Sequence, residues 1–373
     1  MQQLPLGVNE SVIFTLRSLY SRYGYSQYKM SKFEEYDLYA RNKDFLISDQ
    51  VITFTDIGGK LMALKPDVTL SIVKNSKDDP FAVQKLYYNE NVYRVTKGSH
   101  SFQEIMQVGL ECIGNIDDYC ICEVLTLAAE SLRSISEKSI LDISHLGLLS
   151  RLIDSIGIPG EGKAAVLKQI GEKNLHELAA TCRTYGISEH NIDVLKQIVA
   201  ASGAPETVLP KIRDLLSGIT GTGVVDQLLR VFSAIEDGEL KSMLRFDFSV
   251  VDDIHYYNGI VFKGFIDGLP RSVLSGGQYD NLMQKMKRKS GAIGFAVYTD
   301  MLQRLDRSRK EYDVDILMLY GENSNLAAIR SKAKALREQG YSVMVQRYIP
   351  EGIRYRQLLR LQGSEVETVE NDA

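Results

Sequence analysis

The chain has 373 residues, of which 44% are hydrophobic and 25% are charged, and its formal net charge is −4. This composition is typical of a soluble globular protein, and the length favours two or three domains. The negative net charge excludes a general electrostatic attraction to nucleic acids. No apolar run approaches the roughly 18–20 residues of a membrane span, and the N-terminal segment lacks the pattern of a signal peptide. These features predict a cytoplasmic protein without a membrane partner.

The cysteine pattern favours reduced thiols. The four cysteines, Cys112, Cys120, Cys122 and Cys182, are few and are not spaced as CxxC pairs. A zinc site or a disulfide framework normally requires paired or closely clustered cysteines. We therefore expect no metal and no cofactor.

The first part of the chain predicts a helix, a hairpin and a second helix. Residues 11–23 place apolar side chains at helical spacing before Gly24, which is a common helix stop. Residues 51–56 precede two glycines and predict a hairpin, and a further helix is expected to begin near Pro66.

The middle of the chain predicts a sheet that a helical segment interrupts. Residues 81–95 and 101–114 are long enough for two antiparallel strands, and residues 123–135 have an amphipathic helical pattern. From residue 148 to residue 242 the apolar periodicity is helical throughout, with glycine and proline between the segments. Strand patterns then return at 243–251, 260–266 and 292–298.

A separate small unit follows Arg309. We expect a strand at 313–320, a helix at 325–339, a strand at 341–348, a helix at 352–361 and a frayed tail after it. The order of elements predicts an α+β protein with an antiparallel sheet flanked by helices. Its expected parts are a core domain (1–147 and 243–309), a helical insertion (148–242) and a truncated α/β module (312–373).

Several short motifs occur in an order that resembles one known family. They are LPLGVNE, TDIGGKLMALKPDVT, NENVYR with QVGLECIG, HYYNGIVF, SGGQYD and GAIGFAVY. Together they resemble histidyl-tRNA synthetase of the class II aminoacyl-tRNA synthetase superfamily. They resemble more specifically its non-catalytic paralogues, the regulatory subunits of ATP phosphoribosyltransferase. The resemblance covers residues 1–305 and extends more loosely to the C-terminal module.

The resemblance implies a histidine-binding pocket. Asp67 and Thr69 match residues that bind the ammonium group, and Arg94 matches the arginine that contacts the carboxylate and an α-phosphate. Gln107 and Glu111 match a glutamine and a glutamate that the family's pocket also carries. Tyr256 and Tyr257 match the tyrosine pair that closes the imidazole pocket, with Tyr279 nearby. Anionic, amide and phenol groups are suited to a zwitterion that carries a polar ring.

Structural roles remain open for some of these residues. Gln107 and Glu111 are four apart on an expected strand and share one face, which could be solvated. Asp67 could simply cap the following helix. Tyr256 and Tyr257 are adjacent on an expected strand and should point to opposite faces, so that one packs in the core.

Three departures from the family pattern argue against catalysis. Asp252 occupies the position of a catalytic arginine four residues before the tyrosine pair, and Met301 occupies the position of a second arginine. The loop after Arg94 also lacks a glutamate and an arginine that the family carries. Amino-acid activation needs cations around the transferring phosphoryl group, and an acid there adds repulsion. We therefore expect ligand contacts without catalysis.

The resemblance then implies a regulatory subunit without chemistry of its own. Its partner would be a short-form catalytic ATP phosphoribosyltransferase, which joins ATP to phosphoribosyl pyrophosphate in the first step of histidine biosynthesis. Histidine would be the feedback effector, and the assembly would contain a homodimer within a hetero-octamer, without tRNA binding. One alternative is an atypical histidyl-tRNA synthetase, with Lys263 or Arg271 replacing the lost arginines. Another is an amino-acid-binding paralogue with a different partner.

Overall fold

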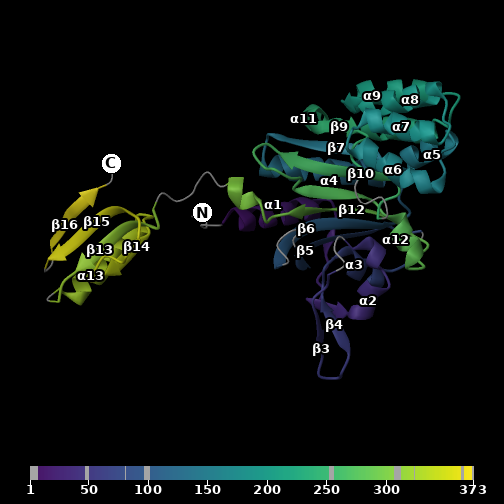
Figure 1. The fold of residues 1–373 in the computed structure, drawn as a ribbon. Coiled ribbons are helices and arrows are strands. Elements are labelled where there is room, and N and C mark those ends of the chain that lie inside the picture. Colours follow the sequence, from purple (N-terminus) through teal and green to yellow (C-terminus); the bar gives the residue numbers. More distant parts are fainter. Residues whose placement is uncertain are drawn as a thin grey trace. The chain divides into compact units, whose positions relative to one another are not determined.

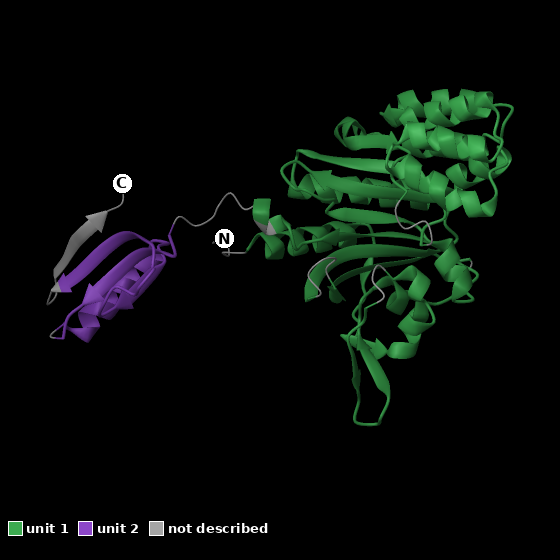
Figure 2. Ribbon diagram, in the orientation of Figure 1, with its two compact units in different colours: residues 1–305 green, residues 306–373 purple. Residues whose placement is uncertain are grey.

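The structure is a computed structural model. It describes residues 7–46, 50–79, 81–95, 101–251, 256–305, 312–322, 324–362 and 365–371. The chain forms two compact units, Met1–Leu305 and Asp306–Ala373 (Figure 2).

The first unit is built on a mixed nine-stranded sheet (Figure 1). In spatial order its strands are β1 (Ser26–Gln27), β5 (Gln84–Val95), β6 (Phe102–Gly114), β12 (Gly291–Tyr298), β11 (Leu274–Gln278), β10 (Ile260–Ile266), β7 (Ser139–His145), β9 (Leu244–Asp247) and β8 (Ser202–Gly203). The pairs from β5 to β7 are antiparallel, in agreement with the predicted antiparallel sheet, although β11 was not predicted as a strand. The β1–β5 and β7–β9 pairs are parallel. The sequence analysis did not predict β7, whose buried Asp142 accepts 2.7 and 2.8 Å hydrogen bonds from Arg245 on β9.

Two helices pack against one face of this sheet. They are α1 (Val8–Arg22) and the predicted amphipathic helix α4 (Asp118–Ile135). Val108 and Leu110 of β6 belong to the same buried cluster as these helices. Because side chains alternate along a strand, Gln107 and Glu111 lie on the opposite face. One face of β6 therefore builds the core while the other remains available for a site.

The segment after β7 is predominantly helical, as predicted. It contains α5 (Leu146–Ser155), α6 (Gly160–Gly171), α7 (Leu175–Thr184), α8 (Glu189–Ala200), α9 (Pro205–Leu216), α10 (Gly223–Ser233) and α11 (Gly238–Met243). The two-residue strand β8 interrupts it and pairs with β9. The helix α10 is fixed to α4 by a 2.8 Å hydrogen bond from Gln227 to Asp118. The division of this unit into core and insertion stays a prediction.

A smaller layer covers part of the other face of the sheet. A three-stranded sheet contains β2 (Phe33–Glu35), β4 (Leu61–Leu64) and β3 (Thr53–Thr55), and the last two form the predicted hairpin. Nearby are α2 (Tyr36–Ala40), η1 (Lys43–Phe45), α3 (Thr69–Asn75) and α12 (Asp280–Lys285), while η2 (Leu302–Leu305) ends the unit. A second hydrophobic cluster joins α3 and α12 to the sheet.

The second unit contains β13 (Val314–Tyr320), α13 (Leu326–Glu338), β14 (Val343–Gln346), β15 (Tyr355–Gln362) and β16 (Glu365–Asn371), in the strand order β14-β13-β15-β16. The predicted helix at 352–361 is wrong, since β15 pairs in parallel with β13. The predicted frayed tail is also wrong, since β16 pairs with β15. Leu358 packs in one buried cluster and Leu359 in another, so that both faces of β15 are covered.

All four cysteines are free, with Cys112, Cys120 and Cys182 buried and Cys122 half-buried. Among the residues that the structure describes, no helix has both the length and the apolar character that crossing a bilayer requires.

Candidate ligand-binding site

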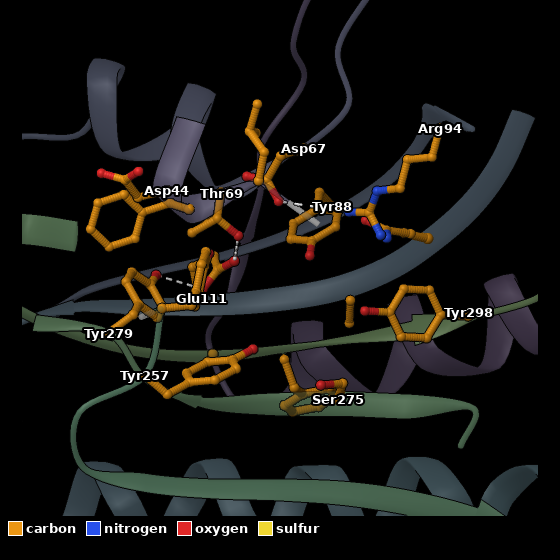
Figure 3. A pocket seen from close by; sticks show the side chains of 17 residues that line it. Asp44, Asp67, Thr69, Tyr88, Arg94, Glu111, Tyr257, Ser275, Tyr279 and Tyr298 are labelled. Carbon is orange, nitrogen blue, oxygen red and sulfur yellow. Dashed lines mark hydrogen bonds and ion pairs between the residues drawn. The ribbon is translucent and has the colours of Figure 1, made fainter. Parts of the chain in front are cut away.

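One cavity of about 200 Å³ opens between the sheet and the smaller layer (Figure 3). Its walls come from β5, β6, β11 and β12, from the start of α3 and from the turn before β10. It brings together all eight residues that the sequence analysis proposed: Asp67, Thr69, Arg94, Gln107, Glu111, Tyr256, Tyr257 and Tyr279. Their assignment to histidine binding stays a prediction.

Glu111 lines the cavity, and both of its carboxylate oxygens accept hydrogen bonds. Thr69 Oγ1 donates to Oε1 at 2.8 Å, and the Tyr279 hydroxyl donates to Oε2 at 2.6 Å. Burial raises the pKa of Glu111 to about 8, and nearby Asp67 adds to this while the two hydroxyl donors oppose it. Gly294 faces Glu111 across the β6–β12 ladder, and a Cβ atom there would overlap Oε2 of Glu111.

Asp67 and Arg94 form the charged end of the cavity. Oδ1 of Asp67 accepts a 2.9 Å hydrogen bond from the Leu70 amide, so Asp67 does cap α3 while it also lines the cavity. Arg94 donates from Nε to the Pro66 carbonyl at 2.7 Å and places Nη2 3.7 Å from Oδ2 of Asp67. Burial raises the pKa of Asp67, and the Arg94 charge opposes this rise.

The aromatic end of the cavity consists of three tyrosines. The ring centroids of Tyr256 and Tyr257 are 4.7 Å apart, and those of Tyr256 and Tyr279 are 5.8 Å apart. The expectation that Tyr256 and Tyr257 point to opposite faces of a strand is wrong, because both precede β10 in a turn and both line the cavity. Burial raises the phenol pKa of Tyr256 and Tyr279 well above the usual value, so these hydroxyls stay neutral.

The sequence analysis missed Tyr88, Ser275 and Tyr298, which also line the cavity. Tyr88 lies six residues before Arg94 on β5 and thus on the same face, a signal that strand alternation could have given. It faces Gly109 on β6, and a Cβ atom at Gly109 would lie 2.5 Å from the Tyr88 hydroxyl.

Arg94 is the only cation among the described residues that line this cavity, against the acids Asp44, Asp67 and Glu111. Met301 is 6% exposed, belongs to the main hydrophobic core and does not line the cavity. Asp252 lies outside the described residues. Lys263 and Arg271, the suggested replacements for the lost arginines, are not among the lining residues. The described walls of the cavity therefore carry groups that suit an amino-acid zwitterion and one positive group for a phosphate.

Sequence comparisons identify related proteins over most of the chain. A family model described as histidyl-tRNA synthetase matches residues 7–302. A protein of Oceanobacillus iheyensis is 25% identical over 90% of this chain and 84% of its own length. One from Caldanaerobacter subterraneus subsp. tengcongensis is 28% identical over 87% of this chain and 86% of its own length. Both are named ATP phosphoribosyltransferase regulatory subunit, which confirms the resemblance predicted from the motifs.

Solved structures show the same fold. A Bacillus halodurans protein, described as an ATP phosphoribosyltransferase regulatory subunit/histidyl-tRNA synthetase, is 22% identical with a TM-score of 0.73 and covers 93% of both chains. A chain from the ATP phosphoribosyl transferase complex of Thermotoga maritima is 21% identical, with a TM-score of 0.61, over 80% of this chain and 98% of that one. Histidyl-tRNA synthetase from Nostoc is 16% identical, with a TM-score of 0.70, over 94% of this chain and 86% of that one. The predicted class II synthetase-like fold is confirmed.

Proposed function

This chain belongs to the histidyl-tRNA synthetase family, and on that premise we propose that it is a regulatory subunit of ATP phosphoribosyltransferase in histidine biosynthesis. The main observation in support is the composition of the first cavity. Its walls combine groups that suit an amino acid, and Arg94 is the only cation among the described lining residues. Family relatives with the regulatory name support the same role.

Free histidine is the ligand that we assign to the cavity. Its ammonium group would lie at Asp67 and Thr69, and its carboxylate would pair with the Arg94 guanidinium. The imidazole ring would lie among the tyrosines, with Glu111 accepting a hydrogen from a ring nitrogen. Paired charges and neutral hydroxyl donors can satisfy each polar group of a buried zwitterion.

We do not assign aminoacylation to this chain, because the first step of that reaction needs several cations. Transfer of an α-phosphoryl group depends on preorganised positive groups, and removing one donor of this kind typically costs about 2.7–4 kcal/mol of transition-state stabilisation. The described cavity supplies Arg94, whereas the position of the second family arginine holds the core residue Met301. We therefore assign the chain a non-catalytic role.

The partner in this proposal is a short-form catalytic ATP phosphoribosyltransferase, with the chain acting as a homodimer within a hetero-octamer. Histidine would act as a feedback effector by favouring one state of the assembly. Such coupling is typically about 1–3 kcal/mol, and ligands on the catalytic side must change histidine affinity by the same factor.

Reconstitution of the complex tests the proposal. The purified chain is mixed with a short-form catalytic subunit, and phosphoribosyl transfer to ATP is measured at increasing histidine concentrations. We expect a stable complex, a gain in activity and inhibition by histidine. Glu111→Gln should preserve the complex and weaken the inhibition, whereas the exposed control Glu206→Gln should leave both unchanged. Failure to form a complex or to gain activity would refute the proposal.

The second candidate is an atypical histidyl-tRNA synthetase, which the retained Arg94 and the family match favour. An ATP–pyrophosphate exchange assay with histidine separates the two functions. The regulatory proposal expects no exchange above a protein-free blank, and robust histidine-dependent exchange would establish the enzyme instead.

A further inference from the structure

A second cavity, of about 620 Å³, lies beside the first. Its walls are the first turns of α5 and α6, the turn at Tyr257 and Asn258, and Asn281 of α12. Among the described lining residues the two cavities share Tyr257 alone. The second cavity is therefore separate from the proposed histidine site, and nothing above assigns it a ligand.

The charges around the two cavities have opposite signs. The described walls of the second cavity contain Arg151 and Lys163 and no aspartate or glutamate. The first cavity has acids in excess of its single arginine. Asp154 pairs with Lys163 from outside the lining, so among the described residues Arg151 supplies the unpaired positive charge that attracts anions. The second cavity thus differs from the first in the charge of the ligand that suits it.

Two helix N-termini also meet at this cavity. Leu146 and Gly147 open the ten-residue helix α5, and Gly160 opens the twelve-residue helix α6. The first turn of a helix presents amide hydrogens and a partial positive charge, which favour phosphate groups. In α5 the Leu146 amide already donates to the Gly259 carbonyl at 2.9 Å and the Leu148 amide donates to His145, so the helix contributes mainly its partial charge. Pro159, the N-cap residue of α6, makes no side-chain capping bond.

His145 supplies a buried polar group in the cavity wall. Its Nδ1 accepts a 3.1 Å hydrogen bond from the Leu148 amide, and its side chain makes no other hydrogen bond with the described part of the chain. Burial, with a contribution from the Arg151 charge, lowers the pKa of His145 to about 4, so the ring is neutral. A neutral ring that accepts at Nδ1 carries its hydrogen on Nε2. The residue is 8% exposed and lines the cavity, where Nε2 can donate to a ligand.

Arg151 and Lys163 both keep N–H donors that are not used in hydrogen bonds with the described residues. Arg151 donates from Nε to the Gly147 carbonyl at 3.2 Å, and its terminal nitrogens make no hydrogen bond with the described residues. Lys163 donates to both carboxylate oxygens of Asp154 at 3.0 Å, which occupies two of its three hydrogens. Arg151 is therefore the main free charge, with Lys163 in support.

We propose that this second cavity binds the phosphate group of a small phosphorylated molecule, held by Arg151, Lys163, His145 and the first turns of α5 and α6. The volume leaves room for more than the phosphate, and Leu146, Ala164 and Leu167 give the remainder an apolar wall. This binding site goes beyond the proposed regulatory function and does not depend on it.

Titration calorimetry with inorganic pyrophosphate tests the proposal on the full chain at low ionic strength, without histidine. We expect saturable binding that Arg151→Gln weakens by about tenfold or more, since a lost charge-assisted hydrogen bond has an effect of this size. Lys168→Gln is the matched control, because Lys168 lies on α6 with 75% of its side chain exposed and does not line the cavity.

A second control, Arg94→Gln, removes the cation of the first cavity and should leave pyrophosphate binding unchanged. Binding that depends on Arg151 and on neither control supports the proposal. The absence of saturable binding, equal losses in Arg151→Gln and Lys168→Gln, or loss in Arg94→Gln would overturn it.

Discussion

Tyr279 donates a 2.6 Å hydrogen bond to Oε2 of Glu111, although 168 positions separate the two residues in the chain. Thr69 bonds the other oxygen of the same carboxylate at 2.8 Å. The start of α3, the strand β6 and the residue after β11 are thus joined at one buried group. This arrangement fixes the carboxylate in place before a ligand enters, which reduces the ordering that binding requires.

The raised pKa of Glu111 predicts that histidine binding releases a proton. In the empty cavity Glu111 is largely protonated below about pH 8, and a ligand that donates to the carboxylate favours its ionised form. Affinity should therefore rise from about pH 7 to about pH 8. Calorimetry in two buffers with different ionisation enthalpies measures the released proton.

Glu111→Gln is the matching variant. It should weaken histidine binding by about tenfold or more and remove both the proton release and the pH dependence in this range. Glu206→Gln, an exposed glutamate on α9, should behave as the unmodified chain. Unchanged affinity in Glu111→Gln would place histidine elsewhere.

Gly294→Ala should displace the Glu111 carboxylate without adding or removing a charged group. A Cβ atom at this position would overlap Oε2 of Glu111 and would lie 2.5 Å from the Leu110 carbonyl oxygen. We expect a loss of about 1–3 kcal/mol in the free energy of unfolding, as for overpacked cores, together with weaker histidine binding. Urea unfolding and calorimetry measure the two effects.

The control for this variant is Gly223→Ala. Gly223 opens α10, and a Cβ atom there would meet no other atom within 4 Å. Stability and histidine binding should both be preserved. Equal behaviour of the two alanine variants would contradict the proposed close packing of Gly294 against Glu111.

The sequence predicted the members of the first cavity better than their arrangement. Asp67, Arg94 and Glu111 were found because each belongs to a motif with fixed spacing. Tyr88 was missed although strand alternation places it on the same face of β5 as Arg94, whereas its close packing against Gly109 depends on the pairing with β6, which no local pattern specifies. The neighbours Tyr256 and Tyr257 both line the cavity because a turn, rather than a strand, places them.

The C-terminal unit shows a different limit of sequence reasoning. Residues 352–361 are rich in arginine and leucine, which favour helices by intrinsic propensity. In the structure Leu358 and Leu359 are buried on opposite faces of β15, between β13 and β16. Pairing with distant strands therefore overrides local propensity here, as it commonly does.

Met301→Ala should reduce stability without affecting ligand binding. Met301 is 6% exposed within the main hydrophobic core and does not line the first cavity. Removing a buried methionine side chain typically costs about 2–5 kcal/mol of unfolding free energy. Urea unfolding should show this loss, while histidine affinity at a temperature where the variant is folded should be unchanged. Weaker histidine binding by the folded variant would show that position 301 still serves the site.

The lowered pKa of the buried His145 ring predicts that the protein loses stability in acid. Its pKa is lowered from 6.5 to about 4 in the folded chain, mainly by burial. Between these values the unfolded chain binds more protons than the folded one, so stability falls as the pH decreases from about 6.5 towards 4. His145→Asn keeps a side-chain acceptor for the Leu148 amide, since asparagine is a favoured N-cap residue, and removes the titrating ring. The variant should therefore lose less unfolding free energy than the unmodified chain between pH 7 and pH 4.5, by about 1.4 kcal/mol for each pKa unit crossed.

His176 lies on α7 and is the control, because replacing it with asparagine should leave the acid sensitivity intact. Parallel stability curves for His145→Asn and the unmodified chain would show that the buried ring does not titrate in this range.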